Sequence, residues 1–128
     1  MITILLFHIV IINKIDEFCF TNKDILNVKI LNNILTIAYG AFKDCKKLIN
    51  IELGKNINSL RAACFDGCTS LKGIYIPRKI NYIGYHCFYN CKSLNNITLI
   101  NKKMIIDPYA IEKCFNVTKN LFFIKIPL

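Results

Sequence analysis

The chain of 128 residues is 54% hydrophobic and 20% charged, a balance that excludes an intrinsically disordered protein and suits one domain with its own core. Its 17 basic and 8 acidic residues give a net charge of +9, which favours acidic partners, although the lysines are scattered as on a solvated surface. The longest apolar run, residues 2–12, is too short to cross a membrane and lacks the preceding basic residue and following cleavage site of a secretory signal.

One unit repeats along the chain at a constant interval, and its clearest copies begin at Ala41, Cys64 and Cys87. A fixed period of this kind indicates a solenoid, in which each coil stacks on the previous one. Each unit contains an alternating segment such as Ile51-Glu52-Leu53, whose apolar residues face inward in a strand. We therefore expect equivalent segments to pair as a parallel sheet, stabilised mainly by contacts between neighbouring coils.

The first coil is expected to be a degenerate cap of the array. The constant offset that separates Ala41 from Cys64 also places Ile2 opposite Ile25, but it puts Lys14 at an apolar position. The same offset aligns Phe18-Cys19 with Ala41-Phe42.

The last full coil also departs from the pattern, because Lys103 falls at an apolar position, Ile111 replaces a phenylalanine and the register slips after Cys114. We expect a single domain, residues 1–128, that belongs to a longer array. The predicted coils are residues 1–24, 25–47, 48–70, 71–93 and 94–120, with a partial coil at 121–128.

Equivalent positions of successive units form columns that we expect inside the solenoid. Phe42, Phe65 and Phe88 form a predicted aromatic ladder. The segment that contains each phenylalanine is expected to form one helical or 3₁₀ turn. A second column consists of cysteines, which pack well as small buried residues: Cys45, Cys68, Cys91 and Cys114.

The seven cysteines leave three interpretations open, namely buried free thiols, disulfides and a metal site. Stacked cysteines point in parallel, so their Cβ atoms stay about one strand spacing apart, beyond the usual ~3.5–4.5 Å of a disulfide. The pairs Cys64/Cys68 and Cys87/Cys91 could together bind zinc, but all four side chains are predicted to face inward. We therefore expect free core thiols, no metal and no cofactor.

The segments Leu71–Pro77 and Ile80–Cys91 resemble the BspA-type leucine-rich repeat. The resemblance covers residues 25–127 and, more weakly, residues 2–24. It implies a β-rich α/β fold, which is a right-handed solenoid with a parallel sheet and short helical or 3₁₀ turns. It also implies protein binding by adhesins at the cell surface or in the medium, whereas unpaired core thiols and no clear signal peptide favour an intracellular location.

Two sets of exposed residues are candidate ligand contacts. Outward strand positions form a row in which Tyr75 is a plausible anchor for a partner: Lys29, Glu52, Tyr75, Thr98 and Lys125. Basic residues just beyond the strands form a rim that stacking brings together, suited to carboxylates, sulfates or phosphates: Lys55, Arg78, Lys79, Lys102 and Lys103.

These features predict a non-catalytic module that binds an acidic or glycosylated protein through the sheet face and the basic rim. Nucleic acid is disfavoured, because most aromatic residues belong to interior columns rather than to a stacking surface. The sequence contains no nucleophile–base pairing and no Gly-rich phosphate loop, so no enzyme is predicted. The alternatives are an intracellular structural or scaffold repeat protein and, less favoured, a thiol or metal protein.

Overall fold

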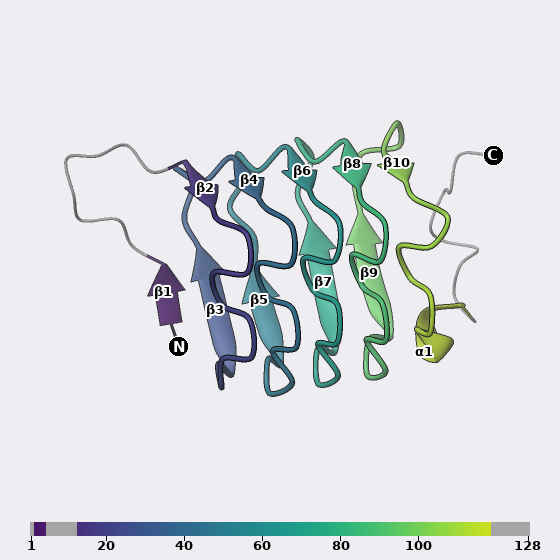
Figure 1. Cartoon of the computed structure of the whole chain (residues 1–128). Coiled ribbons are helices and arrows are strands. Elements are labelled where there is room, and N and C mark those ends of the chain that lie inside the picture. Colours follow the sequence, from purple (N-terminus) through teal and green to yellow (C-terminus); the bar gives the residue numbers. More distant parts are fainter. Residues whose placement is uncertain (1, 5–12, 119–128) are drawn as a thin grey trace.

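A computed structural model describes residues 2–4 and 13–118 as a row of stacked coils (Figure 1). One side of the coils carries the longer strands: β1 (Ile2–Ile4), β3 (Asn27–Ile30), β5 (Asn50–Glu52), β7 (Gly73–Ile76) and β9 (Asn96–Leu99). A second side carries shorter strands: β2 (Lys14–Ile15), β4 (Thr36–Ile37), β6 (Ser59–Leu60), β8 (Tyr82–Ile83) and β10 (Ile105–Ile106). The short helix α1 (Phe115–Thr118) follows β10.

Every strand pair in the described part of the chain is parallel, so the predicted parallel β-solenoid is confirmed, with very little helix. The short strands form one sheet in the order β10-β8-β6-β4-β2. The longer strands form two sheets, β1-β3-β5 and β7-β9, and the ladder is interrupted between β5 and β7. The middle coils keep the repeat interval in their pairing, as Val28 opposite Ile51 and Ile74 opposite Ile97 show.

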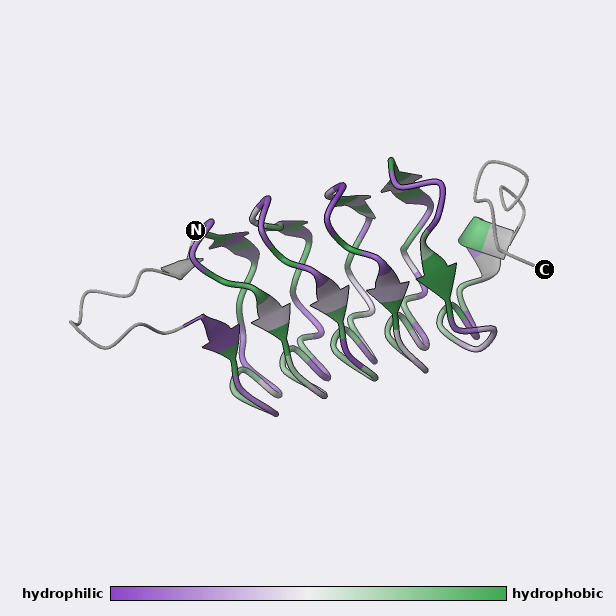
Figure 2. Ribbon diagram, turned by 90° about the horizontal axis from the view of Figure 1, so that it is seen from above, coloured by the Kyte–Doolittle hydropathy of each residue, from purple (hydrophilic) through white to green (hydrophobic). Residues whose placement is uncertain are grey.

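The core lies between the two sides of each coil and is built from residues at equivalent positions. Figure 2 shows that apolar and polar segments recur in a similar order from coil to coil. The expected aromatic ladder is present: Phe42 stacks on Phe65, and Phe65 stacks on Phe88, each with ring centroids 5.5 Å apart. All three rings are fully buried. Because a single coil cannot enclose these side chains, its stability depends on its neighbours.

The corner that carries each phenylalanine is a run of turns. Its i→i−3 backbone bonds, such as Cys45 N–H to the Phe42 carbonyl (3.2 Å), have 3₁₀ spacing. They alternate with bonds to the next coil, such as Phe42 N–H to the Cys64 carbonyl (2.8 Å). Positive φ angles of 53–76°, a conformation that favours Gly, Asn and Asp, recur in every corner and occur twice in most of them: Phe18, Asn22, Gly40, Asp44, Ala63, Gly67, His86, Asn90 and Lys113.

The constant offset predicted for the first coil is wrong. Ile2 pairs with Val28 instead of Ile25, and Ile37 pairs with Ile15 instead of Lys14. This register leaves Lys14 exposed and buries Ile15, which avoids placing an ammonium group in the core. Phe20, rather than Cys19, therefore joins the aromatic ladder, with its ring 5.2 Å from that of Phe42.

The irregularity at Lys103 reflects a local shift of one residue in the turn before β10. Met104 occupies the apolar position, where it is buried, and Lys103 is exposed. The Met104 N–H bonds the Asn101 carbonyl (3.2 Å), as the Ile80 N–H bonds that of Pro77 (3.1 Å). The predicted partial coil at 121–128 lies outside the described residues. No helix within the described part of the chain has the length and apolar character of a membrane span.

Candidate functional site

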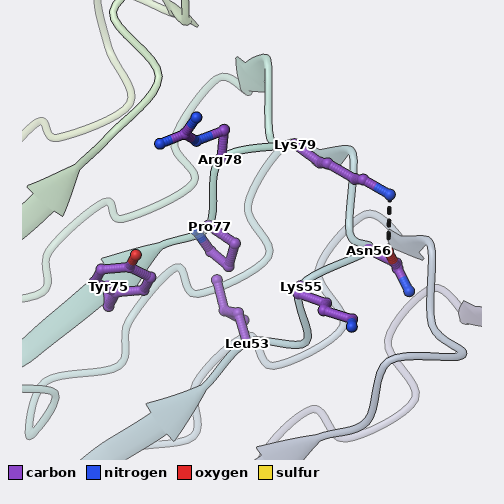
Figure 3. A pocket seen from close by; sticks show the side chains of 7 residues that line it. All are labelled: Leu53, Lys55, Asn56, Tyr75, Pro77, Arg78 and Lys79. Atoms are coloured by element: carbon purple, nitrogen blue, oxygen red, sulfur yellow. Dashed lines mark hydrogen bonds between the residues drawn. The ribbon is translucent and has the colours of Figure 1, made fainter.

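A pocket of about 530 Å³ lies beyond the ends of β5 and β7, where the ladder of the longer strands is interrupted. Its volume falls in the range of about 300–1,000 Å³ that is usual for ligand sites. The residues that line it come from two neighbouring coils (Figure 3): Leu53, Lys55, Asn56, Tyr75, Pro77, Arg78 and Lys79. We call it the basic pocket.

The floor of the basic pocket is apolar. Leu53 and Pro77 are buried, and Figure 3 shows them between Tyr75 on one side and Lys55 on the other. Tyr75 points outward because β7 alternates, with Ile74 and Ile76 buried on either side of it. Its side chain is 53% exposed, so the ring offers apolar area and a hydroxyl group to a ligand.

Three basic side chains surround this floor without a neutralising acid. Lys55, Arg78 and Lys79 are all exposed, and no Asp or Glu is among the described residues that line the pocket. The Lys79 ammonium donates a hydrogen bond to Asn56 Oδ1 (2.9 Å), which holds it at the rim. Within the described residues, none of the three basic groups forms an ion pair. The pocket therefore favours an anionic group attached to an apolar one.

The structure brings together only part of the predicted outward row. Lys29 and Glu52 face each other on β3 and β5, and their charges lie 3.9 Å apart, so they partly neutralise each other. Tyr75 and Thr98 face each other on β7 and β9, beyond the interruption of the ladder. Of the described members of the row, Tyr75 alone lines the basic pocket, and Lys125 lies outside the described residues.

The predicted basic rim is likewise divided. Lys55, Arg78 and Lys79 share the pocket, whereas Lys102 and Lys103 are exposed on the next coil and do not line it. Sequence reasoning missed the contribution of Asn56, whose side-chain amide also donates to the Asn32 carbonyl (2.8 Å). The asparagines at the same part of the preceding coil, Asn32 and Asn33, were the signal that could have shown it.

The cysteines occupy the core, apart from the exposed Cys19. The thiols of one column donate to backbone carbonyls of the preceding coil, as Cys45 does to Phe20 (3.1 Å) and Cys68 to Phe42 (3.2 Å). Burial raises the pKa of the Cys45 thiol to about 11, and burial also raises the pKa of Cys68. Among the described residues no group of three or more His, Cys, Asp or Glu is arranged to hold a metal ion.

Comparison with solved structures identifies the same architecture in bacterial proteins. A leucine rich cell surface protein from Faecalibacterium prausnitzii is 29% identical and superposes with a TM-score of 0.82 over 91% of this chain and 30% of its own. The T. pallidum leucine rich repeat protein is 26% identical, with a TM-score of 0.77 over 81% of this chain and 49% of its own. A Bacteroides ovatus leucine-rich repeat protein, 22% identical over 81% of this chain and 33% of its own, shares the fold (TM-score 0.58).

The chain thus spans 30% and 49% of the lengths of the first two of these proteins. The search for similar curated proteins found no match. The family model for the BspA type leucine rich repeat region matches six copies over residues 12–126. The chain belongs to the BspA-type leucine-rich repeat family.

Proposed function

We propose that this leucine-rich repeat chain is a non-catalytic binding module that engages an acidic segment of a partner protein through the basic pocket. Leucine-rich repeats are typical of protein-interaction modules, because stacked coils present an extended surface. The observation that carries the proposal is the union of an exposed tyrosine, an apolar floor and three unneutralised cations in one pocket.

The chemistry of the pocket defines the segment it would accept. An aliphatic or aromatic side chain of the partner would pack on Leu53 and Pro77, against the ring of Tyr75. A neighbouring Asp or Glu would accept charge-assisted hydrogen bonds from Arg78 and Lys55. The similarity to a cell surface protein supports a role in adhesion outside the cell.

The test uses two double variants that change the net charge by the same amount. Arg78→Glu/Lys79→Glu alters the basic pocket, and Lys102→Glu/Lys103→Glu alters exposed lysines of the next coil. Binding is measured by calorimetry to peptides that combine an aromatic residue with neighbouring Asp or Glu residues, and to the same peptides with Asn or Gln. We expect the first variant, and Tyr75→Ala, to weaken binding to the acidic peptides at least about tenfold.

The matched control separates a specific site from general attraction. The variant at Lys102 and Lys103 should lose less affinity than the Arg78/Lys79 variant, because these lysines lie on the next coil and do not line the pocket, so they attract the peptides only through space. Equal losses in the two double variants would show that only the overall positive charge attracts the peptides. Unchanged binding in both the Arg78/Lys79 variant and Tyr75→Ala would remove the basic pocket as the site.

A further inference from the structure

A second hollow of about 550 Å³ lies on the outer face of the five-stranded sheet. It shares no residue with the basic pocket. It involves strands β2, β4 and β8 and the turns that follow β2, β4 and β6. We call it the tyrosine hollow, and these residues line it: Lys14, Glu17, Thr36, Ala38, Tyr39, Arg61, Ala62 and Tyr82.

Small residues in one coil create this hollow. Ser59 stands between Thr36 and Tyr82 in the strand register, so the middle coil contributes only a small side chain at that position, while its Arg61 lines the hollow farther along. Ala62 lies beside Tyr39 on the next coil, since the Gly40 N–H bonds the Ala62 carbonyl (3.1 Å). The hollow is therefore bounded by Tyr39 and Tyr82, whose coils are two strand spacings, or roughly 10 Å, apart, with Thr36 rather than Tyr39 at the position equivalent to Tyr82.

The two tyrosines are suited to contact a flat ligand. Tyr39 is 42% exposed, and Phe18 meets its ring edge-on at 5.1 Å and 86°, which limits its orientation. Tyr82 is 36% exposed on the other side. Because the two rings lie at different positions along and across the coils, they suit separate units of an extended ligand rather than the two faces of one ring.

The charges around the tyrosine hollow balance, unlike those of the basic pocket. Lys14 is paired with Asp16 at 3.4 Å. Within the described residues, the Arg61 guanidinium and the Glu17 carboxylate form no hydrogen bond or ion pair, and both are exposed. The hollow thus offers strong donors and a strong acceptor without a net charge, which favours a neutral ligand with groups that both donate and accept.

We propose that the tyrosine hollow binds a neutral oligosaccharide. The apolar C–H face of a pyranose would pack on Tyr39 or Tyr82, while its hydroxyl groups would donate to Glu17 and accept from Arg61. A proline-rich peptide also docks on aromatic grooves, but proline has no N–H to donate, so Glu17 would lose water without gaining a partner.

The experiment measures binding of the intact chain to cellohexaose, maltohexaose, mannohexaose and chitohexaose at millimolar concentration. Saturation-transfer NMR detects the bound sugar, and tyrosine emission follows the titration because the chain has six Tyr and no Trp. We expect at least one of these sugars to bind, with affinity about tenfold or more weaker in Tyr39→Ala and in Glu17→Ala/Arg61→Ala. Tyr39→Phe should retain most of the affinity, because it keeps the ring.

Two controls make the result decisive. Tyr75→Ala removes a similarly exposed tyrosine from the basic pocket and should leave sugar binding unchanged. Circular dichroism melts identify a variant that has unfolded, and Tyr82→Ala then replaces it in the comparison. The proposal is overturned if none of the sugars binds, if the hollow variants bind as well as the parent chain, or if a decaproline peptide binds at the tyrosines and the sugars do not.

Discussion

Truncation of Phe65 to alanine should destabilise the solenoid more than any comparable change at its ends. Phe65 is fully buried and stacks on both Phe42 and Phe88 at 5.5 Å. Removal of a buried Phe side chain costs about 3–5 kcal/mol, to which lost ring contacts contribute about 0.5–1.5 kcal/mol each. We expect a loss of about 4 kcal/mol, a large part of the roughly 5–15 kcal/mol that stabilises a typical domain.

Phe20→Ala is the matched control for this prediction. Phe20 is only half-buried and stacks on a single neighbour, Phe42, at 5.2 Å, so we expect about half the loss. Urea unfolding, followed by circular dichroism and tyrosine emission, gives the change in free energy from the midpoint when the slope is unchanged. A loss below ~1 kcal/mol for Phe65→Ala, or equal losses for both variants, would refute the view that stacking between coils carries the stability.

Three further predictions test the register and the thiols. In the same urea assay, Met104→Ala should lower the free energy of unfolding by about 2–5 kcal/mol and Lys103→Ala by less than about 0.5 kcal/mol. A larger loss for Lys103→Ala than for Met104→Ala would show that Lys103, at the constant repeat interval, occupies the core position instead. In the folded chain, thiol reagents should modify Cys19 fast and the six buried cysteines slowly. Burial raises the pKa of Cys45 from 9.0 to about 11, so the unfolded chain releases the Cys45 proton at a lower pH than the folded chain does. The contribution of Cys45 to the free energy of unfolding should therefore be constant below pH 9 and decline between pH 9 and 11. If the stability of a Cys45→Ala chain falls as steeply over that range, the prediction is wrong.

The middle coils could be predicted from their sequence almost completely. Their positions repeat at one interval, so the inward and outward faces, the Phe42–Phe65–Phe88 ladder and the cysteine column follow from strand geometry and stacking alone. The candidate pocket could be predicted in part. Tyr75, Lys55, Arg78 and Lys79 were recognisable as exposed neighbours, but the apolar floor between them was not.

The amino-acid sequence by itself determined that this chain stacks in coils of nearly constant length, because each coil can bury its apolar face only against a similar neighbour. The tertiary structure alone decided the register at the ends, where Ile15 and Met104 displace Lys14 and Lys103 from the core. A coil at the end of the described repeats matches its neighbours less closely, so the avoidance of a buried ammonium group outweighs the regular spacing there. The basic pocket and the tyrosine hollow also arise only in the tertiary structure, because each depends on the sizes of side chains that different coils bring together.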